Sequence, residues 1–169
     1  MKSPKLTVGE ICLFGILGAM TFGAKYVMSW MPNIEPVSLM VMLFAVTFGI
    51  KALFPIYLYV VLEILFFGLG TWNFCYLYVW AVLAVLALVL KNMTHPLGWA
   101  MLSGVFGLFF GALCGIVDIF IGGFGYAIAK WVSGIPFDLA HCAGNFVIAL
   151  LLFAPMRTLL DKLYKRMAR

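Results

Sequence analysis

Residues 98–121 read GWAMLSGVFGLFFGALCGIVDIFI, an apolar run of 24 residues in which Asp118 is the only charged side chain. A helix needs about 20 mostly apolar residues to cross a lipid bilayer, so this run predicts a transmembrane helix. The run is continuous and does not alternate between polar and apolar residues, which favours a helix over a membrane-spanning strand.

The rest of the chain repeats this pattern. Further apolar runs, separated by turn-forming residues, lie at about 8–29, 36–50, 52–69, 74–90 and 137–156. Hydrophobic residues make up 66% of the 169 residues and charged residues 10%, which leaves too little polar surface for a water-soluble globule. The sequence therefore predicts an all-α integral membrane protein, with residues 1–169 forming a single domain of six transmembrane helices.

The basic residues predict the orientation of this domain. If both termini are cytoplasmic, most lysines and arginines lie on the cytoplasmic side, as the positive-inside rule requires: Lys2, Lys5, Lys51, Lys91, Arg157, Lys162, Lys165, Arg166 and Arg169. We therefore expect a multi-pass protein of the cell membrane. Topology explains the net charge of +5, so no nucleic-acid partner is expected. The basic C-terminal segment 156–169 either anchors at lipid headgroups or docks on a cytoplasmic partner.

Catalytic and metal-binding motifs are missing from the sequence. The four cysteines are scattered one per predicted span, without a CxxC pair, and are interpreted as small apolar core residues: Cys12, Cys75, Cys114 and Cys142. No P-loop, GxGxxG, HExxH or GxSxG pattern occurs. We predict no catalytic residue, metal site or cofactor. Active transport by this chain would need energy from another protein.

Two helices carry stripes of small residues. Gly15, Ala19 and Gly23 recur every four residues in the first predicted span, and the fifth span has a similar stripe at Ser103, Gly107, Gly111 and Gly115. Such faces let helices approach closely in lipid. Each stripe serves either packing within the bundle or contact with an external partner. The first span is our candidate for a partner contact.

Ionisable residues occur well inside the predicted spans, at Lys25, Glu63 and Asp118. Each is costly to expose to lipid and should face the bundle interior, a partner or water. Lys25 either extends toward the headgroups or pairs with Glu35. Glu63 and Asp118 are either internal hydrogen-bonded struts or groups that line a cavity.

A polar triplet marks the last span. Asp138, His141 and Asn145 follow each other at i, i+3 and i+7 and share one helix face just after Pro136, a residue suited to a helix start. The triplet is either a cap with interhelical hydrogen bonds or a solute-binding face. Three aromatic loops, at 30–36, 71–80 and 125–136, form either an interfacial belt or a lid. The candidate binding residues are Asn33, Glu35, Trp72, Asn73, Tyr76, Trp131, Asp138, His141 and Asn145.

Three stretches give the chain a family resemblance: LFGILGAMTFGAKYVM (13–28), PNIEPVSLMVMLFAVTFG (32–49) and GIPFDLAHCAGNFVIALLLFAPMRTLLDKL (134–163). The chain resembles the substrate-binding S component of energy-coupling factor (ECF) vitamin transporters. The resemblance implies a six-helix bundle that binds a vitamin near its outer ends, beneath the first, third and fifth loops. It also implies a membrane scaffold subunit and two cytoplasmic ATPases as partners. Gly15 and Ala19 match the positions that contact the scaffold, where the family usually has two alanines.

The sequence does not identify which vitamin is bound. Many aromatic residues with few fixed charges favour a large or flat ring system, cobalamin first, and otherwise a smaller vitamin such as pyridoxine or pantothenate. Two other classes of function remain as alternatives. One is a small integral-membrane enzyme using Asp138 and His141 as acid and base. The other is a self-sufficient channel or secondary transporter.

Overall fold

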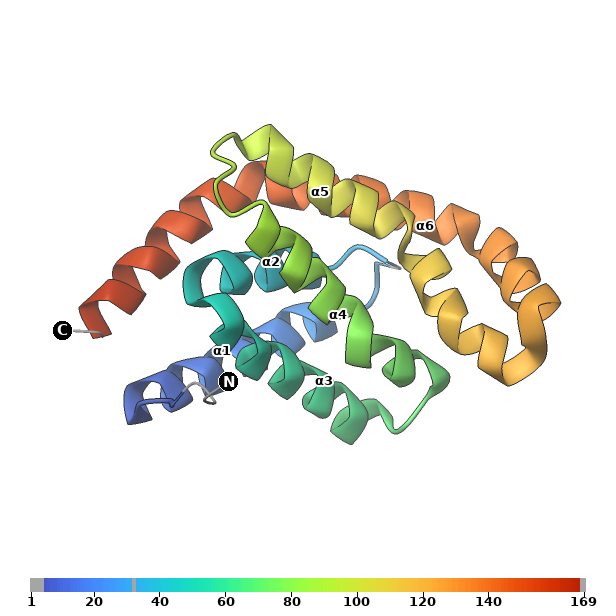
Figure 1. The fold of residues 1–169 in the computed structure, drawn as a ribbon, viewed down its shortest axis with the longest axis horizontal. Helices are drawn as coiled ribbons and strands as arrows, with labels where there is room; N and C mark the ends of the chain where they lie inside the picture. The colour runs from blue at the N-terminus through green and yellow to red at the C-terminus, as the bar shows by residue number, and fades with distance from the viewer. Residues whose placement is uncertain (1–4, 32, 168–169) are drawn as a thin grey trace.

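The computed structural model describes residues 5–31 and 33–167, and almost all of this part of the chain is helical (Figure 1). The elements are α1 (Val8–Val27), α2 (Val37–Phe48), the 3₁₀ helix η1 (Gly49–Ala52), α3 (Leu53–Phe67), α4 (Thr71–Val89), α5 (Pro96–Leu108) and α6 (Phe110–Met167). No strand occurs among the described residues. The predicted all-α class is confirmed. Lys2 and Arg169, predicted on the cytoplasmic side, lie outside the described residues.

Four helical stretches in the described residues are long and apolar enough to cross a membrane: Val8–Val27, Val37–Phe67, Thr71–Val89 and Pro96–Met167. They are compatible with a membrane location. The structure shows four such stretches where the sequence predicts six spans. The second and third predicted spans join because η1 connects α2 to α3 without a loop, and the fifth and sixth join within α5 and α6.

Helix α6 is a hairpin of two arms, 110–122 and 124–167, that meet at Gly123 (Figure 1). Gly123 has φ 82°, a backbone conformation that glycine adopts without a steric penalty. The chain therefore reverses within one residue. The predicted loop at 125–136 and the predicted helix start at Pro136 are wrong, because this segment is helical and Pro136 lies inside the second arm.

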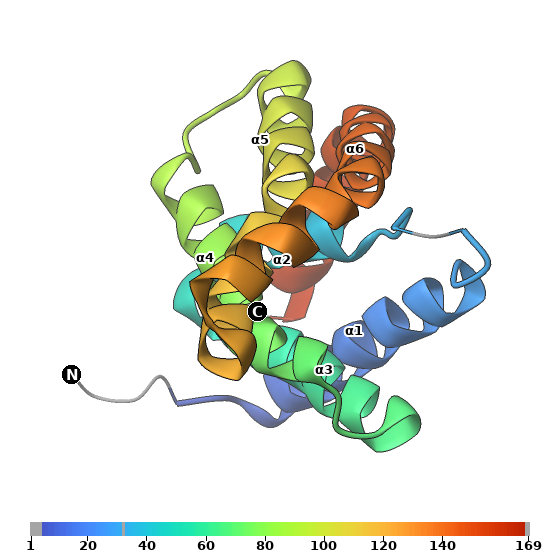
Figure 2. The same ribbon diagram turned by 90° about the vertical axis from the view of Figure 1, so that its right-hand side faces the viewer.

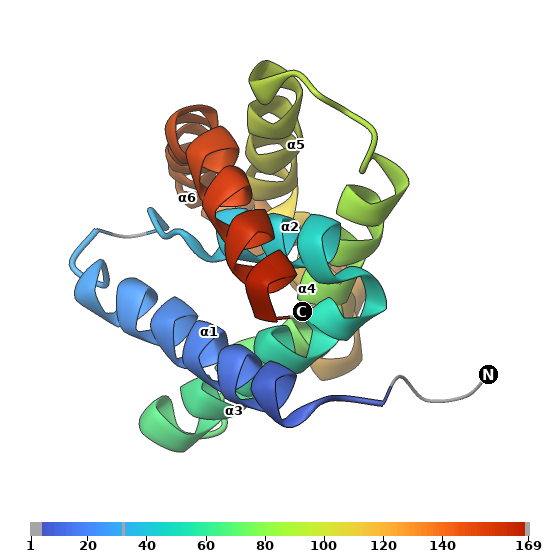
Figure 3. The same cartoon turned by 90° about the vertical axis from the view of Figure 1, so that its left-hand side faces the viewer.

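Helix α2 lies at the centre of the bundle, enclosed by the other helices (Figures 2 and 3). Almost every residue of α2 is buried, as expected for a helix that is apolar on all sides. Around it, Trp80 and Trp99 are fully buried, and the ring of Trp99 stacks on Phe153 with 4.4 Å between centroids. The core thus fixes the positions of α4, α5 and α6 around α2.

A polar cluster joins three elements at one end of the bundle. The Glu10 carboxylate accepts hydrogen bonds from Lys51 Nζ at 2.6 Å and from the Tyr164 hydroxyl at 2.7 Å. Thr7 caps α1 through the backbone N–H of Glu10, a stabilising helix start. The first turn of α1, η1 and the last turns of α6 are therefore held together.

Candidate functional site

Two adjoining cavities lie away from the Glu10 cluster. The first, of about 280 Å³, lies between the end of α1, the connection to α2, and helices α4 and α6. The second, of about 500 Å³, lies between the start of α4 and the two arms of α6. Asn33 and Phe110 line both cavities. Phe110 therefore stands between two compartments of one candidate site.

Lys25 is the centre of an ion cluster at the first cavity. Its Nζ donates to Glu63 Oε2 at 2.9 Å, to the Tyr76 hydroxyl at 3.0 Å and to the Tyr59 hydroxyl at 3.2 Å. It also lies 3.7 Å from Glu35 Oε2, the partner that the sequence suggests. Glu63, for which the sequence offers no partner, is a strut that joins α3 to α1.

Glu35 belongs to the connection between α1 and α2 and lines the first cavity. Burial raises the pKa of its carboxyl group, and the charge of Lys25 partly opposes this effect. The charged cluster thus extends from the helices into the loop that covers them. Its members come from four separate segments, so the cluster fixes the wall of the cavity.

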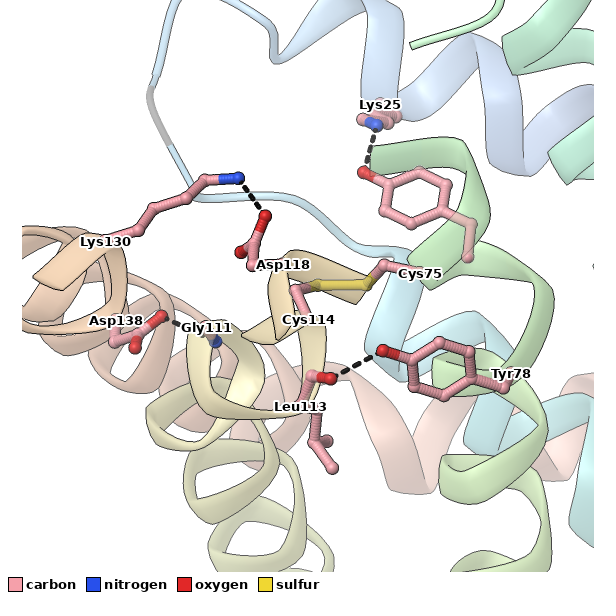
Figure 4. Close-up of a disulfide and its surroundings, with 10 residues drawn as sticks. Lys25, Cys75, Tyr78, Gly111, Leu113, Cys114, Asp118, Lys130 and Asp138 are labelled. Carbon is pink, nitrogen blue, oxygen red and sulfur yellow. Dashed lines mark hydrogen bonds and ion pairs between the residues drawn. A yellow bond between two sulfur atoms is a disulfide. The ribbon is translucent and has the colours of Figure 1, made fainter. Parts of the chain in front are cut away.

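Asp118 and Lys130 pair across the α6 hairpin, with Lys130 Nζ 2.5 Å from Asp118 Oδ1 (Figure 4). Both residues line the second cavity. Of the two interpretations of Asp118, the structure supports a cavity-lining group that is also ion-paired. Lys130 is a wall residue that the sequence did not suggest, because residues 125–136 were expected to form a loop.

Asp138 lies on the same hairpin, further from the turn at Gly123 than Asp118 and Lys130. Its Oδ1 accepts a hydrogen bond from the backbone N–H of Gly111 at 3.1 Å (Figure 4). Its Oδ2 has no hydrogen-bond partner among the described residues, although Asp138 is only 4% exposed. Of the two interpretations of the triplet, the one with a cap holds in part: Asp138 lies within the second arm and does not cap its own helix, but it caps the start of the first arm through the hydrogen bond from Gly111.

His141 and Asn145 have different surroundings. His141 lines the first cavity, packs edge-on against Phe110 at 4.9 Å between centroids, and has no partner for either ring nitrogen among the described residues. Asn145 lines neither cavity. Its Nδ2 donates to Ser38 Oγ at 2.9 Å and to the Ser103 carbonyl at 3.2 Å. Asn145 thus ties α6 to α2 and α5.

Most of the remaining candidate binding residues line a cavity, and one does not. Tyr76 lines the first cavity, Trp72 and Trp131 line the second, and Asn33 lines both. Asn73 lines neither, and its Oδ1 accepts from the Gly70 N–H at 2.6 Å at the start of α4. Phe110 was missed, because an aromatic residue inside an apolar run carries no signal that separates a cavity wall from a core.

A disulfide joins Cys75 of α4 to Cys114 of α6, with 5.1 Å between the Cα atoms (Figure 4). The interpretation of these two cysteines as unpaired core residues is wrong. Their sequence separation of 39 residues gives no pairing signal, and only the fold brings them together. Cys12 and Cys142 are free thiols. The bond holds α4 against the first arm at the second cavity, where the Tyr78 hydroxyl also donates to the Leu113 carbonyl.

The two stripes of small residues have different environments. A Cβ on Gly107 would lie 2.9 Å from the backbone of His141, so much of the stripe in α5 and α6 packs within the bundle. A Cβ on Gly15 or Gly23 would meet nothing within 4 Å, and Ala19 is exposed. The α1 stripe therefore faces outward from the described residues.

No family model, curated protein or solved structure matches this chain. No cluster of three or more His, Cys, Asp or Glu side chains with metal-binding geometry occurs in residues 5–31 and 33–167. What the described residues do offer is a pair of cavities with aromatic walls and buried polar groups that lack protein partners, an arrangement suited to binding a small molecule.

Proposed function

We propose that this chain is the S component of an ECF-type vitamin importer, with six membrane crossings and both termini in the cytoplasm. The observation that carries the proposal is the pair of adjoining cavities at one end of a bundle of apolar helices. Within this proposal, Gly123 divides Pro96–Met167 into two crossings, and η1 divides Val37–Phe67.

The solute contacts of the proposal come from the cavity walls. Trp72, Tyr76, Trp131, Asp138 and His141 contact the vitamin, and Asn33 and Glu35 close the site from the loop between α1 and α2. Pockets of about 300 to 1,000 Å³ suit drug-sized ligands. The cavity volumes of about 280 and 500 Å³ favour a vitamin smaller than cobalamin, such as pyridoxine or pantothenate.

The partners of the proposal are a membrane scaffold subunit and two cytoplasmic ATPases. Support comes from the outward-facing Gly15, Ala19 and Gly23 and from the absence of a nucleotide-binding motif in the sequence. Small residues on one helix face allow close contact with a helix of another subunit. The scaffold therefore docks on this face of α1.

The test combines solute binding with co-purification. Purified protein is offered a panel of radiolabelled vitamins, and the scaffold is co-expressed to measure complex formation. We expect Gly15→Leu with Ala19→Leu to abolish co-purification and uptake while solute binding persists. The matched control is Ala143→Leu with Ala154→Leu, which adds similar bulk, smaller by one methylene group, at exposed positions of α6. Co-purification that survives the α1 double substitution contradicts the proposed docking face.

A further inference from the structure

The walls of the two cavities hold more acidic than basic side chains. Two lysines and four carboxylates lie in or directly behind these walls: Lys25, Lys130, Glu35, Glu63, Asp118 and Asp138. With every one of these groups ionised, two negative charges are left without a counter-charge. Asp138 forms no salt bridge among the described residues, and Lys130, which lines the same cavity, is paired with Asp118.

Asp138 is an unusual group for a membrane helix. It is 4% exposed, and its Oδ2 has no hydrogen-bond partner among the described residues. The carboxylate nevertheless lines the second cavity. A buried carboxylate with an unpaired oxygen is strongly disfavoured unless another group donates to it or neutralises it. Trp131 lines the same cavity, and its side chain lies beside the Asp138 carboxylate, so a solute that reaches Asp138 from this cavity meets both residues.

The aromatic walls of the second cavity favour the same kind of solute. Trp72, Trp131 and Phe110 line it together with Asp138. Tryptophan faces attract cations through the negative charge of the π-system, and they also stack on flat rings. At the first cavity, Lys25 Nζ lies 4.9 Å from the ring centroid of Tyr76 and donates to its hydroxyl, so an aromatic residue contacts an ammonium group there too.

We propose that the two cavities select a solute with a positively charged nitrogen on or beside a flat ring, with Asp138 as its counter-ion. The inference rests on the proposed function, since it names the chemical class of the solute for the same site. Trp72 and Trp131 contact the ring, and His141 offers a hydrogen-bonding nitrogen from the first cavity. A neutral solute leaves the Asp138 carboxylate without a counter-ion, and an anionic solute is repelled, which excludes pantothenate from the two smaller vitamins named above.

The test uses probes that share one ring and differ in charge. Binding of 1-methylnicotinamide (cationic), nicotinamide (neutral) and nicotinate (anionic) to the purified protein is measured by calorimetry, alongside thiamine, pyridoxine, pantothenate and biotin. We expect each cation to bind at least tenfold more tightly than its neutral or anionic counterparts. Asp138→Asn should lower cation affinity at least tenfold. Asp161→Asn, the same change near the other end of the arm, should leave it unaltered.

The outcomes separate this inference from the function on which it rests. If a neutral or anionic vitamin binds as tightly as the cations or more tightly, the inference is overturned and the proposed function stands. If no vitamin of any charge binds, both fail. Because Asp138→Asn also weakens the cap on the first arm, a poorly folded variant is set aside, and the charge series on the unaltered protein decides.

Discussion

Asp138 and Gly111 meet across the α6 hairpin, where Asp138 Oδ1 accepts a hydrogen bond from the Gly111 N–H at 3.1 Å. Gly111 is the second residue of its arm, so its N–H has no acceptor within the helix, and a carboxylate at this end is favoured by the helix dipole. A Cβ on Gly111 would lie 2.5 Å from Asp138 Oδ2. Because Gly111 has no side chain, there is room for the Asp138 carboxylate to lie both at a helix start and at a cavity wall.

Gly111→Ala should weaken solute binding, because the added methyl group displaces the Asp138 carboxylate. We expect affinity to fall about tenfold and stability by about 1 to 3 kcal/mol through the lost hydrogen bond. Equilibrium binding and thermal unfolding measure the two effects. Gly115→Ala is the control, since a Cβ there meets nothing within 4 Å. Equal behaviour of the two variants would mean that the position of the carboxylate is unimportant for binding.

His141→Ala and Asn145→Ala should separate binding from folding. His141 lines the first cavity, so its removal should weaken binding about tenfold while the melting temperature of the empty protein stays near that of the unaltered protein. Asn145 links three helices, so its removal should lower the melting temperature and leave the affinity of the folded fraction intact. If Asn145→Ala weakened binding and His141→Ala lowered only the melting temperature, the binding face would include Asn145 and not His141.

Lys25→Met should destabilise the protein, because it leaves Glu63 buried beside Glu35 without a counter-charge. Removing one partner of a buried ion pair costs about 3 kcal/mol or more, and thermal unfolding in detergent measures this loss. Adding Glu63→Gln should restore much of it. Lys130→Met is a useful comparison, because Lys130 is 46% exposed and its pair should contribute within about 1 kcal/mol. A harmless Lys25→Met would show that the cluster has no structural role.

Breaking the Cys75–Cys114 disulfide should lower thermal stability. Loop-closure entropy for the 39-residue separation sets an upper bound of about 4 kcal/mol. Maleimide labelling of the denatured protein should modify Cys12 and Cys142 alone before reduction, and all four cysteines afterwards. Cys12→Ser and Cys142→Ser serve as controls that keep the bond. Labelling of all four thiols without a reductant would show that the bond is not formed in the protein as isolated.

The purified chain should bind its solute without concentrating it. No nucleotide-binding motif occurs in the sequence, so reconstituted liposomes that contain this chain alone should show binding and no accumulation against a gradient. Adding the scaffold, the ATPases and ATP should produce accumulation. Uptake by the lone chain driven by a proton or sodium gradient would instead indicate a secondary transporter, with Glu63 or Asp118 as the first residues to substitute.

Some features of the fold and of the candidate site can be predicted from local sequence. The apolar runs predict membrane-compatible helices because hydropathy is a property of each segment. The pairing of Lys25 with Glu35 is foreseeable, since the two residues flank one short connection. The pairing of Lys25 with Glu63 is not, because Glu63 lies in a different helix and no local pattern links them.

The errors in the last third of the chain have one physical cause. Local turn signals around residues 122–136 predict a loop, yet a single positive φ at Gly123 completes the reversal. The residues after Gly123 are then free to continue as helix. This shift of the helix start changes Asp138 from a local cap into a cap of the neighbouring arm, and it brings Lys130 to the cavity wall.

The sequence by itself determined the all-helical class, the apolar character of the helices and the small-residue stripe on α1, since each of these depends on residues close together in the chain. Only the tertiary structure decided which helices pair, that Cys75 joins Cys114, and that Asp138 reaches a cavity while Asn145 does not. These features depend on residues distant in sequence, whose contacts exist only after the bundle has packed around α2.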